Sequence, residues 1–238
     1  MIPTMKRIWL NQDNTPELVD PDFANRAALA LASHACNGLM GRVKGDPVFE
    51  EVTEGRQRCW ESKGKTVCYS SCADLAHWVL WNLLGKPTDA SPALRDELRG
   101  INRQEAFGWA VGQNIASLVR YVSPRAYYAA GDNIGTKPGN IVLIGTGGQE
   151  HIAVVREVLP TTLLTFDYGQ YLPATSQYCG KPVARAVTRG TDGRPWLYSG
   201  KPPGRPLVLS IDTGRFVRDV HTETPLSMAY VPDWFEGK

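Results

Sequence analysis

The chain has 238 residues, of which 42% are hydrophobic and 21% are charged, and its formal net charge is +2. A chain so close to neutral, without runs of lysine or arginine, argues against a protein whose main task is to bind nucleic-acid phosphates. No apolar stretch reaches the roughly 18 residues that a membrane span needs, so we expect none. No apolar segment follows the basic residues near the N-terminus. We therefore expect synthesis in the cytoplasm without a conventional signal peptide, so that any export would need another route.

The first half of the chain reads as mainly helical. Residues 1–20 look like an irregular lead-in, and Asn25–Asn37 has the apolar spacing of a helix. Cys36 shares the apolar face of that helix, which predicts a small core residue. Gln104–Val122 predicts a second long helix.

The second half has strand patterns. We expect a long excursion with few regular elements over residues 173–206, rich in Gly, Pro and Arg, which borders a substrate cleft. The expected strands are 141–144, 151–158, 162–168, a hairpin of 207–211 with 216–220, and 227–231.

The five cysteines show neither a CxxC pair nor a Cys/His cluster with zinc spacing, so we predict no metal and no cofactor. Cys59 and Cys68 flank a short loop and would lie opposite each other in a hairpin. A disulfide there would indicate work outside the cytoplasm, and a pair of reduced thiols is the alternative.

Cys72 begins the most informative stretch. Ser71 and Asp74 have the spacing of a capping box, so Cys72 would stand at the first position of a helix. An apolar stripe with helical spacing follows: Leu75, Val79 and Leu83. The unpaired N–H groups at a helix start favour thiolate over thiol, as a nucleophile requires. The alternative is a buried structural cysteine.

A nucleophilic thiol needs a base, and the chain has four histidines. His77 points away from Cys72 on the same helix, His34 does not face the cysteine of its own helix, and we expect His221 at the surface. His151 begins a strand directly after a glycine-rich loop, so it is the best candidate.

Strand geometry indicates a third residue. If the chain turns through Val158–Pro160, His151 lies directly across from Asp167, which would orient the imidazole. A slip of one residue would put Tyr168 there instead, and Gln170 is also an option. Asp167 could equally be a simple turn residue.

The order of these motifs resembles that of the NlpC-type and CHAP peptidoglycan hydrolases, which are papain-like cysteine peptidases. Ser71–Leu75 resembles their Asp-Cys-Ser-Gly-Phe element, Lys137–Ile144 their Pro-Gly-Asp-Leu-Val strand, and His151–Val155 their His-Val-Gly-Ile strand. The resemblance covers residues 66–170 roughly, and Asn140 stands where the family has Asp.

The resemblance implies an α+β, papain-like fold with N-terminal helices packed on an antiparallel sheet. We expect one domain over residues 1–238, with its core at about 22–170. Residues 171–238 would form a C-terminal extension with the excursion and the strand hairpin.

It also implies a function. Cys72 would attack an amide in cell-wall peptidoglycan peptides, His151 would act as the base and Asp167 would orient His151. The protein would be an antibacterial effector or a lysin, and an immunity protein is a candidate partner. Two alternatives stay open: a Cys/His acyltransferase of transpeptidase or transglutaminase type, and a non-catalytic protein that binds peptide or wall.

Overall fold

The computed structural model describes residues 4–36, 47–53, 58–62, 64–85, 135–146, 150–169, 183–191, 195–198, 204–223 and 228–237. Its helices are α1 (Pro21–Cys36), α2 (Pro47–Thr53), α3 (Cys72–Leu83) and α6 (Thr213–Glu223). Its strands are β1 (Met5–Trp9), β2 (Arg58–Ser62), β3 (Lys65–Tyr69), β4 (Ile141–Ile144), β5 (His151–Leu159), β6 (Thr162–Phe166), β7 (Val183–Arg189), β8 (Pro195–Tyr198), β9 (Arg205–Ile211) and β10 (Met228–Pro232). Helices and antiparallel sheets together make the fold α+β, as expected.

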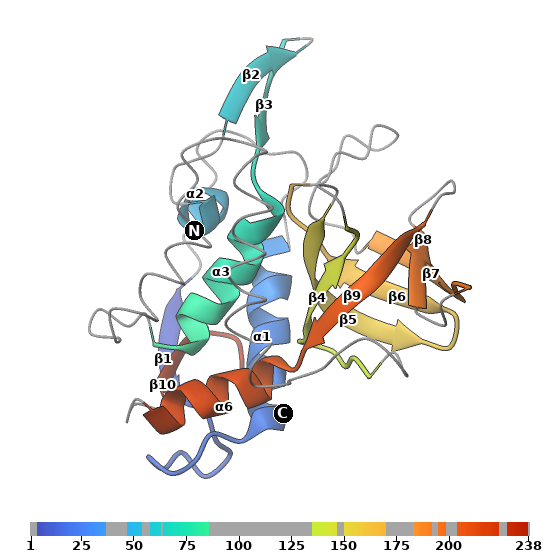
Figure 1. The fold of residues 1–238 in the computed structure, drawn as a ribbon. Coiled ribbons are helices and arrows are strands. Elements are labelled where there is room, and N and C mark those ends of the chain that lie inside the picture. Colours follow the sequence, from blue (N-terminus) through green and yellow to red (C-terminus); the bar gives the residue numbers. More distant parts are fainter. Residues whose placement is uncertain are drawn as a thin grey trace.

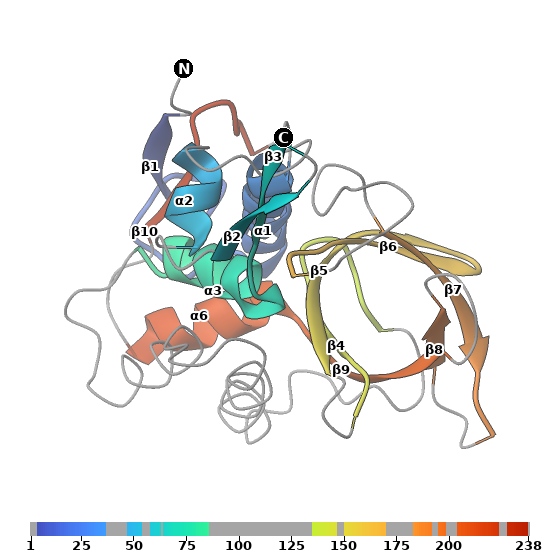
Figure 2. The same cartoon turned by 90° about the horizontal axis from the view of Figure 1, so that it is seen from above.

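The main sheet is a closed barrel of six antiparallel strands in the order β4-β5-β6-β7-β8-β9. Figure 2 looks along this barrel, with the helices gathered on the side of β4 and β5. A closed barrel leaves no strand edge unpaired, so its backbone groups are satisfied within the sheet. The helices α1 and α3 cover one flank of the barrel, where they pack against β5.

The strand β4 and the first five residues of β5 are buried on both faces, which explains the apolar runs in these segments. One set of side chains, including Ile152 and Val154, joins the core shared with the helices. The alternate set, including Ala153 and Val155, fills the barrel interior with Leu163. The period of two along a strand thus builds two separate cores from one sequence.

The helical layer is built around α1, α3 and α6 (Figure 1). Alanine dominates the buried face of α1, so neighbouring elements approach it closely. The helix α3 is buried along nearly its whole length and packs against α1 and β5. This packing brings the start of α3 beside the barrel.

The structure corrects the expected lead-in over residues 1–20. Within it, β1 pairs with β10 as a two-stranded antiparallel sheet, with Met5 opposite Pro232. The strand is short and half-buried, and its partner lies more than two hundred residues away, so local pattern did not reveal it.

The expected strand at residues 216–220 is wrong, and with it the expected hairpin: the segment is the helix α6. The carboxylate of Asp212 accepts hydrogen bonds from the Arg215 backbone and from Asn25, so it caps the helix instead of forming a turn. Phe216, Val217 and Val220 are buried, and that spacing fits one helical face.

The expected excursion over residues 173–206 is also corrected in part. Its described portion contains β7, β8 and the start of β9, which complete the barrel. The helix expected over Gln104–Val122 lies outside the described residues.

The cysteines divide into two chemical states. Cys72 is a free thiol, whereas Cys36 and Cys59 are disulfide-bonded. Cys36 is buried in α1, but it is not the simple core thiol that was expected. The hairpin of β2 and β3 has the predicted register, with Cys59 opposite Cys68. No helix in the described part of the chain is long and apolar enough to cross a membrane.

Candidate active site

Cys72 stands at the first position of α3, and the predicted capping box is present. The Ser71 hydroxyl accepts a hydrogen bond from the Ala73 backbone at 3.2 Å, and the Asp74 carboxylate accepts one from the Ser71 backbone at 2.8 Å. These contacts use two of the unpaired donors at the helix start and fix where the helix begins. The side chain of Cys72 is thereby held at the end of α3 that adjoins the barrel.

The hairpin of β5 and β6 has a different register from the one expected. Leu159 pairs with Thr162, so the turn lies later in the chain than a turn through Val158–Pro160. A bulge between Val155 and Glu157 then shifts the pairing by one residue.

This bulge decides which face Asp167 occupies. Beyond it Val154 pairs with Phe166, so the chain continues with Asp167 level with Ala153. His151 lies two residues from Ala153, which puts it on the same face and makes it a diagonal neighbour of Asp167. Without the bulge the two side chains would lie on opposite faces. The predicted contact is present, although the predicted direct pairing is wrong.

The contact itself is a hydrogen bond between buried side chains. His151 Nε2 lies 2.5 Å from Asp167 Oδ1. Tyr168 faces the other way, and its hydroxyl donates to the Ala35 carbonyl at 2.8 Å. The alternative with Tyr168 beside His151 is therefore not what the structure has, and Gln170 lies outside the described residues.

Sequence reasoning missed two further members of this cluster, Thr165 and Arg185. Arg185 donates to Asp167 Oδ1 at 2.7 Å and to the Thr165 hydroxyl at 2.6 Å, and that hydroxyl donates to Asp167 Oδ2 at 2.6 Å. Thr165 precedes Asp167 by two positions, so strand alternation could have indicated it. Arg185 comes from β7, which the sequence did not predict.

Burial and the charges within the cluster shift the pKa values of Asp167 and His151. Burial alone would raise the pKa of Asp167, but the charge of Arg185 and the hydrogen bonds from His151 and Thr165 lower it to about 2. Burial lowers the pKa of His151 below its usual 6.5, although Asp167 opposes this. At neutral pH an ionised Asp167 therefore faces a neutral imidazole. That imidazole must carry its proton on Nε2, which leaves Nδ1 as the basic nitrogen.

The thiol does not have the low pKa that the helix start led us to expect. Burial raises the pKa of Cys72 to about 12, and the charges of Asp74 and Asp167 add to the effect. Hydrogen bonds from the backbone of Ile152 and of Cys72 itself oppose it. The expected donors are present, but desolvation of the thiolate outweighs them. At neutral pH the Cys72 thiol and the His151 imidazole are therefore both uncharged.

Two backbone contacts bring β5 and β6 to the start of α3. The Ile152 backbone, one residue after His151, hydrogen-bonds to the Cys72 sulfur. Gly169, with φ of +67°, packs so tightly that a Cβ there would lie 2.5 Å from the Cys72 backbone nitrogen. Only glycine combines this φ with this approach. The start of β5, which carries His151, and the segment that follows β6, which carries Asp167, thus border Cys72.

The other histidines have structural environments. His77 is buried beside Trp81, and His34 stacks on Trp78. His221 is buried and its Nε2 lies 3.1 Å from the Leu83 carbonyl, so the expected surface position is wrong. This contact ties α6 to the end of α3.

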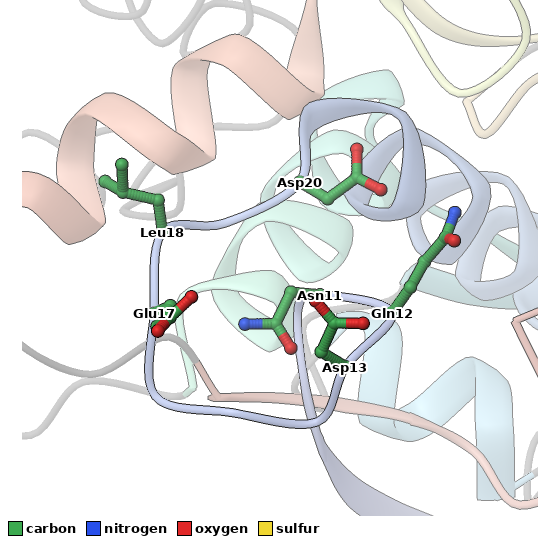
Figure 3. A pocket seen from close by; sticks show the side chains of 6 residues that line it. All are labelled: Asn11, Gln12, Asp13, Glu17, Leu18 and Asp20. Atoms are coloured by element: carbon green, nitrogen blue, oxygen red, sulfur yellow. The ribbon is translucent and has the colours of Figure 1, made fainter.

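An open pocket of about 570 Å³ lies elsewhere, in the loop that leads to α1 (Figure 3). Its lining is acidic and polar apart from one leucine: Asn11, Gln12, Asp13, Glu17, Leu18 and Asp20. Two of these side chains have local structural contacts. Asn11 hydrogen-bonds to Thr15, and Asp20 accepts from the Asp22 backbone at the start of α1.

No group of three or more His, Cys, Asp or Glu side chains suited to a metal ion occurs among the residues that the structure describes. Comparison with protein-family models, with curated proteins and with solved structures gives no significant match. Functional inference therefore depends on the site's chemistry and on the motif resemblance.

The protonation states predict a stability plateau between about pH 6.5 and pH 9. Below the usual His pKa of 6.5, unfolded His151 binds a proton that the folded state resists, so stability falls as pH decreases. Above the usual Cys pKa of 9.0, unfolded Cys72 loses a proton that the folded state keeps until about pH 12, so stability falls again. Each slope is at most about 1.4 kcal/mol per pH unit and group. Urea unfolding from pH 5 to pH 11 measures both.

Cys72→Ala isolates the alkaline part. Above pH 9 the unfolding free energy of the variant should decline less steeply than that of the wild type. The decline at acidic pH should remain, and His34 and His221 also contribute to it because burial lowers the pKa of both. An alkaline slope that is the same in wild type and Cys72→Ala would show that the thiol ionises normally in the folded protein.

Proposed function

We propose that this protein is a papain-like cysteine hydrolase that cleaves amide bonds in bacterial cell-wall peptides. The observation that carries the proposal is the buried His151–Asp167 pair on strands whose backbones border Cys72 at a helix start. A thiol, an imidazole with a defined tautomer and a carboxylate that orients it are the parts of a cysteine-based acyl-transfer site.

The neutral resting pair determines how the reaction would begin. Cys72 Sγ forms a bond to the substrate carbonyl carbon while its proton passes to His151 Nδ1. The negative charge moves to the carbonyl oxygen, where the Cys72 backbone N–H is a candidate donor. The imidazolium then protonates the leaving amine, and an acyl-enzyme forms. Water, activated by His151, releases the acid and restores the thiol.

The substrate class comes from the motif resemblance, which covers the cysteine helix, the following strand and the histidine strand in the order of the NlpC-type and CHAP hydrolases. Two disulfide-bonded cysteines, Cys36 and Cys59, support work in an oxidising place such as a periplasm or cell exterior. Cell-wall peptide is found in such places. An immunity partner belongs to the effector version of this proposal.

Incubation of the full chain with purified peptidoglycan of several chemotypes tests the proposal. We expect release of new amino groups from at least one chemotype, together with shortened peptides in the mass spectrum. An added amine, such as glycine methyl ester, should leave the hydrolysis product dominant. The control is the Cys72→Ala protein under the same conditions.

Each alternative has its own result. Incorporation of the amine in place of hydrolysis would identify the acyltransferase. Binding to insoluble wall without any bond cleavage, by wild type and Cys72→Ala equally, would identify the non-catalytic binding protein.

A further inference from the structure

Arg185 is a buried cation within the barrel. It lies on β7 opposite Leu163 of β6, and its side chain is 4% exposed. Its neighbours Ala184 and Ala186 are exposed, so Arg185 takes the inward position that an apolar residue normally occupies in a small barrel. A buried guanidinium is costly unless its donors are satisfied, and here Asp167 and Thr165 accept from it.

This arrangement saturates the Asp167 carboxylate. Oδ1 accepts from His151 and from Arg185, and Oδ2 accepts from Thr165, with a second Arg185 nitrogen at 3.3 Å. The planar guanidinium matches the two carboxylate oxygens, so it fixes the rotation of the carboxylate. Asp167 can then accept the hydrogen bond from the Nε2–H group of His151 in one orientation only.

The same arrangement determines the charge that His151 experiences. Burial disfavours the imidazolium most, Asp167 favours it, and the charges of Arg185 and Arg205 oppose it. The charges of Asp74 and Asp167 also act on Cys72 and raise its pKa. Because Arg185 lies directly on Asp167, the imidazole is next to a neutralised ion pair and not next to an isolated carboxylate.

We propose that Arg185 is a positioning residue for His151: it holds Asp167 in place and offsets its charge, so that the imidazole stays neutral with Nδ1 as its proton acceptor. This role deepens the proposed function and rests on it for its catalytic meaning. An isolated buried carboxylate would draw a proton onto the imidazole, and an imidazolium cannot accept the thiol proton. Arg185 thereby keeps His151 in the neutral form that can accept the thiol proton, and it acts through Asp167 and not on the substrate.

The test measures the protonation of His151 directly and needs no substrate. The His151 ring is followed by carbon-13 NMR against pH in the full chain, with Cys72→Ala as the background and His151→Gln for assignment. Arg185→Met should raise the His151 pKa by about one pH unit or more, because it leaves the Asp167 charge uncompensated. Arg185→Lys keeps the charge and should restore a value close to that of the background.

Two further variants supply controls. Arg189→Gln changes an exposed arginine on the same strand and should leave the His151 pKa unchanged. If Arg185→Met does not fold, the Asp167→Asn/Arg185→Met double variant leaves no unpaired buried charge, and it should titrate above Asp167→Asn alone. Folding is checked by near-ultraviolet circular dichroism.

An unchanged His151 pKa in folded Arg185→Met, or equal values in the double variant and Asp167→Asn, would overturn the proposal and leave Arg185 as a structural counterion. A raised pKa in a protein that cleaves no peptidoglycan would support the role of Arg185 and reject the proposed substrate. If hydrolysis is found, the acid limb of kcat/KM should move to higher pH in Arg185→Met.

Discussion

Replacement of Cys72 or of His151 by alanine is expected to reduce hydrolysis of peptidoglycan peptides to background. Cys72→Ala removes the atom that would bond to the substrate carbonyl, and His151→Ala removes the group that would take the thiol proton. Because the two act as one unit, the double variant should be no slower than either single variant. Release of amino groups from purified peptidoglycan, followed over time at pH 7, measures the effect.

Asp167 requires a different substitution. The substitution Asp167→Ala would leave the Arg185 charge buried without its partner, which typically costs about 3–5 kcal/mol of unfolding free energy. A loss of activity could then result from unfolding as well as from a direct effect on catalysis. Asp167→Asn also leaves the Arg185 charge uncompensated, but it keeps the side-chain shape and one acceptor oxygen, so its cost in stability should be smaller. We expect activity to fall by about ten- to ten-thousand-fold. His77→Gln is the control, because it replaces a second buried histidine, whose ring stacks on Trp81 of α3. Full activity in Cys72→Ala would show that the nucleophile is misassigned.

Gly169→Ala is expected to give the second large effect, on both stability and activity. The left-handed φ of +67° would cost an alanine about 1–2 kcal/mol. The new Cβ would also lie 2.5 Å from the Cys72 nitrogen and 2.9 Å from the Ser71 carbonyl carbon. Relief of this overlap has to move the start of α3, the same backbone that holds the thiol and the candidate oxyanion donor. We expect a loss of about 2–5 kcal/mol in unfolding free energy and at least a tenfold loss of kcat.

Gly64→Ala separates the two causes. Gly64 has nearly the same φ, +70°, but nothing lies within 4 Å of the position of its Cβ. It should show the conformational cost alone and keep full activity. If Gly169→Ala is no more destabilised than Gly64→Ala and keeps its kcat, the backbone at Gly169 does not hold the start of α3. Urea unfolding and steady-state kinetics on the same preparations give both quantities.

The start of α3 could be predicted because its determinants are adjacent in sequence. Ser71 and Asp74 satisfy the first backbone donors, and the apolar spacing that follows fixes the buried face. The same local logic located β4 and β5, whose apolar runs end at turn residues. It failed for α6, where Asp212 serves equally well in a turn and in a helix cap, and where the hydrogen bonds that it accepts from the Arg215 backbone and from Asn25 make it a cap.

The pKa of Cys72 shows a second limit of local reasoning. The donors at a helix start are a local property, and they are present as predicted. Burial is a tertiary property that depends on everything packed around α3, and its effect on the thiolate is larger. The direction of the shift was therefore decided by packing and not by the capping sequence.

The sequence by itself determined the cysteine helix, the histidine strand and the residue types of a thiol-based site. Only the tertiary structure decided how they are combined. The bulge between Val155 and Glu157 put Asp167 on the face of His151, and the pairing of β7 with β6 brought Arg185 to hold it. An inward arginine breaks the alternation of apolar residues by which strands are recognised. The carboxylate that compensates its charge lies eighteen residues earlier in the chain. The two charges interact through space in the folded protein, so no local sequence pattern indicates that Arg185 and Asp167 form an ion pair.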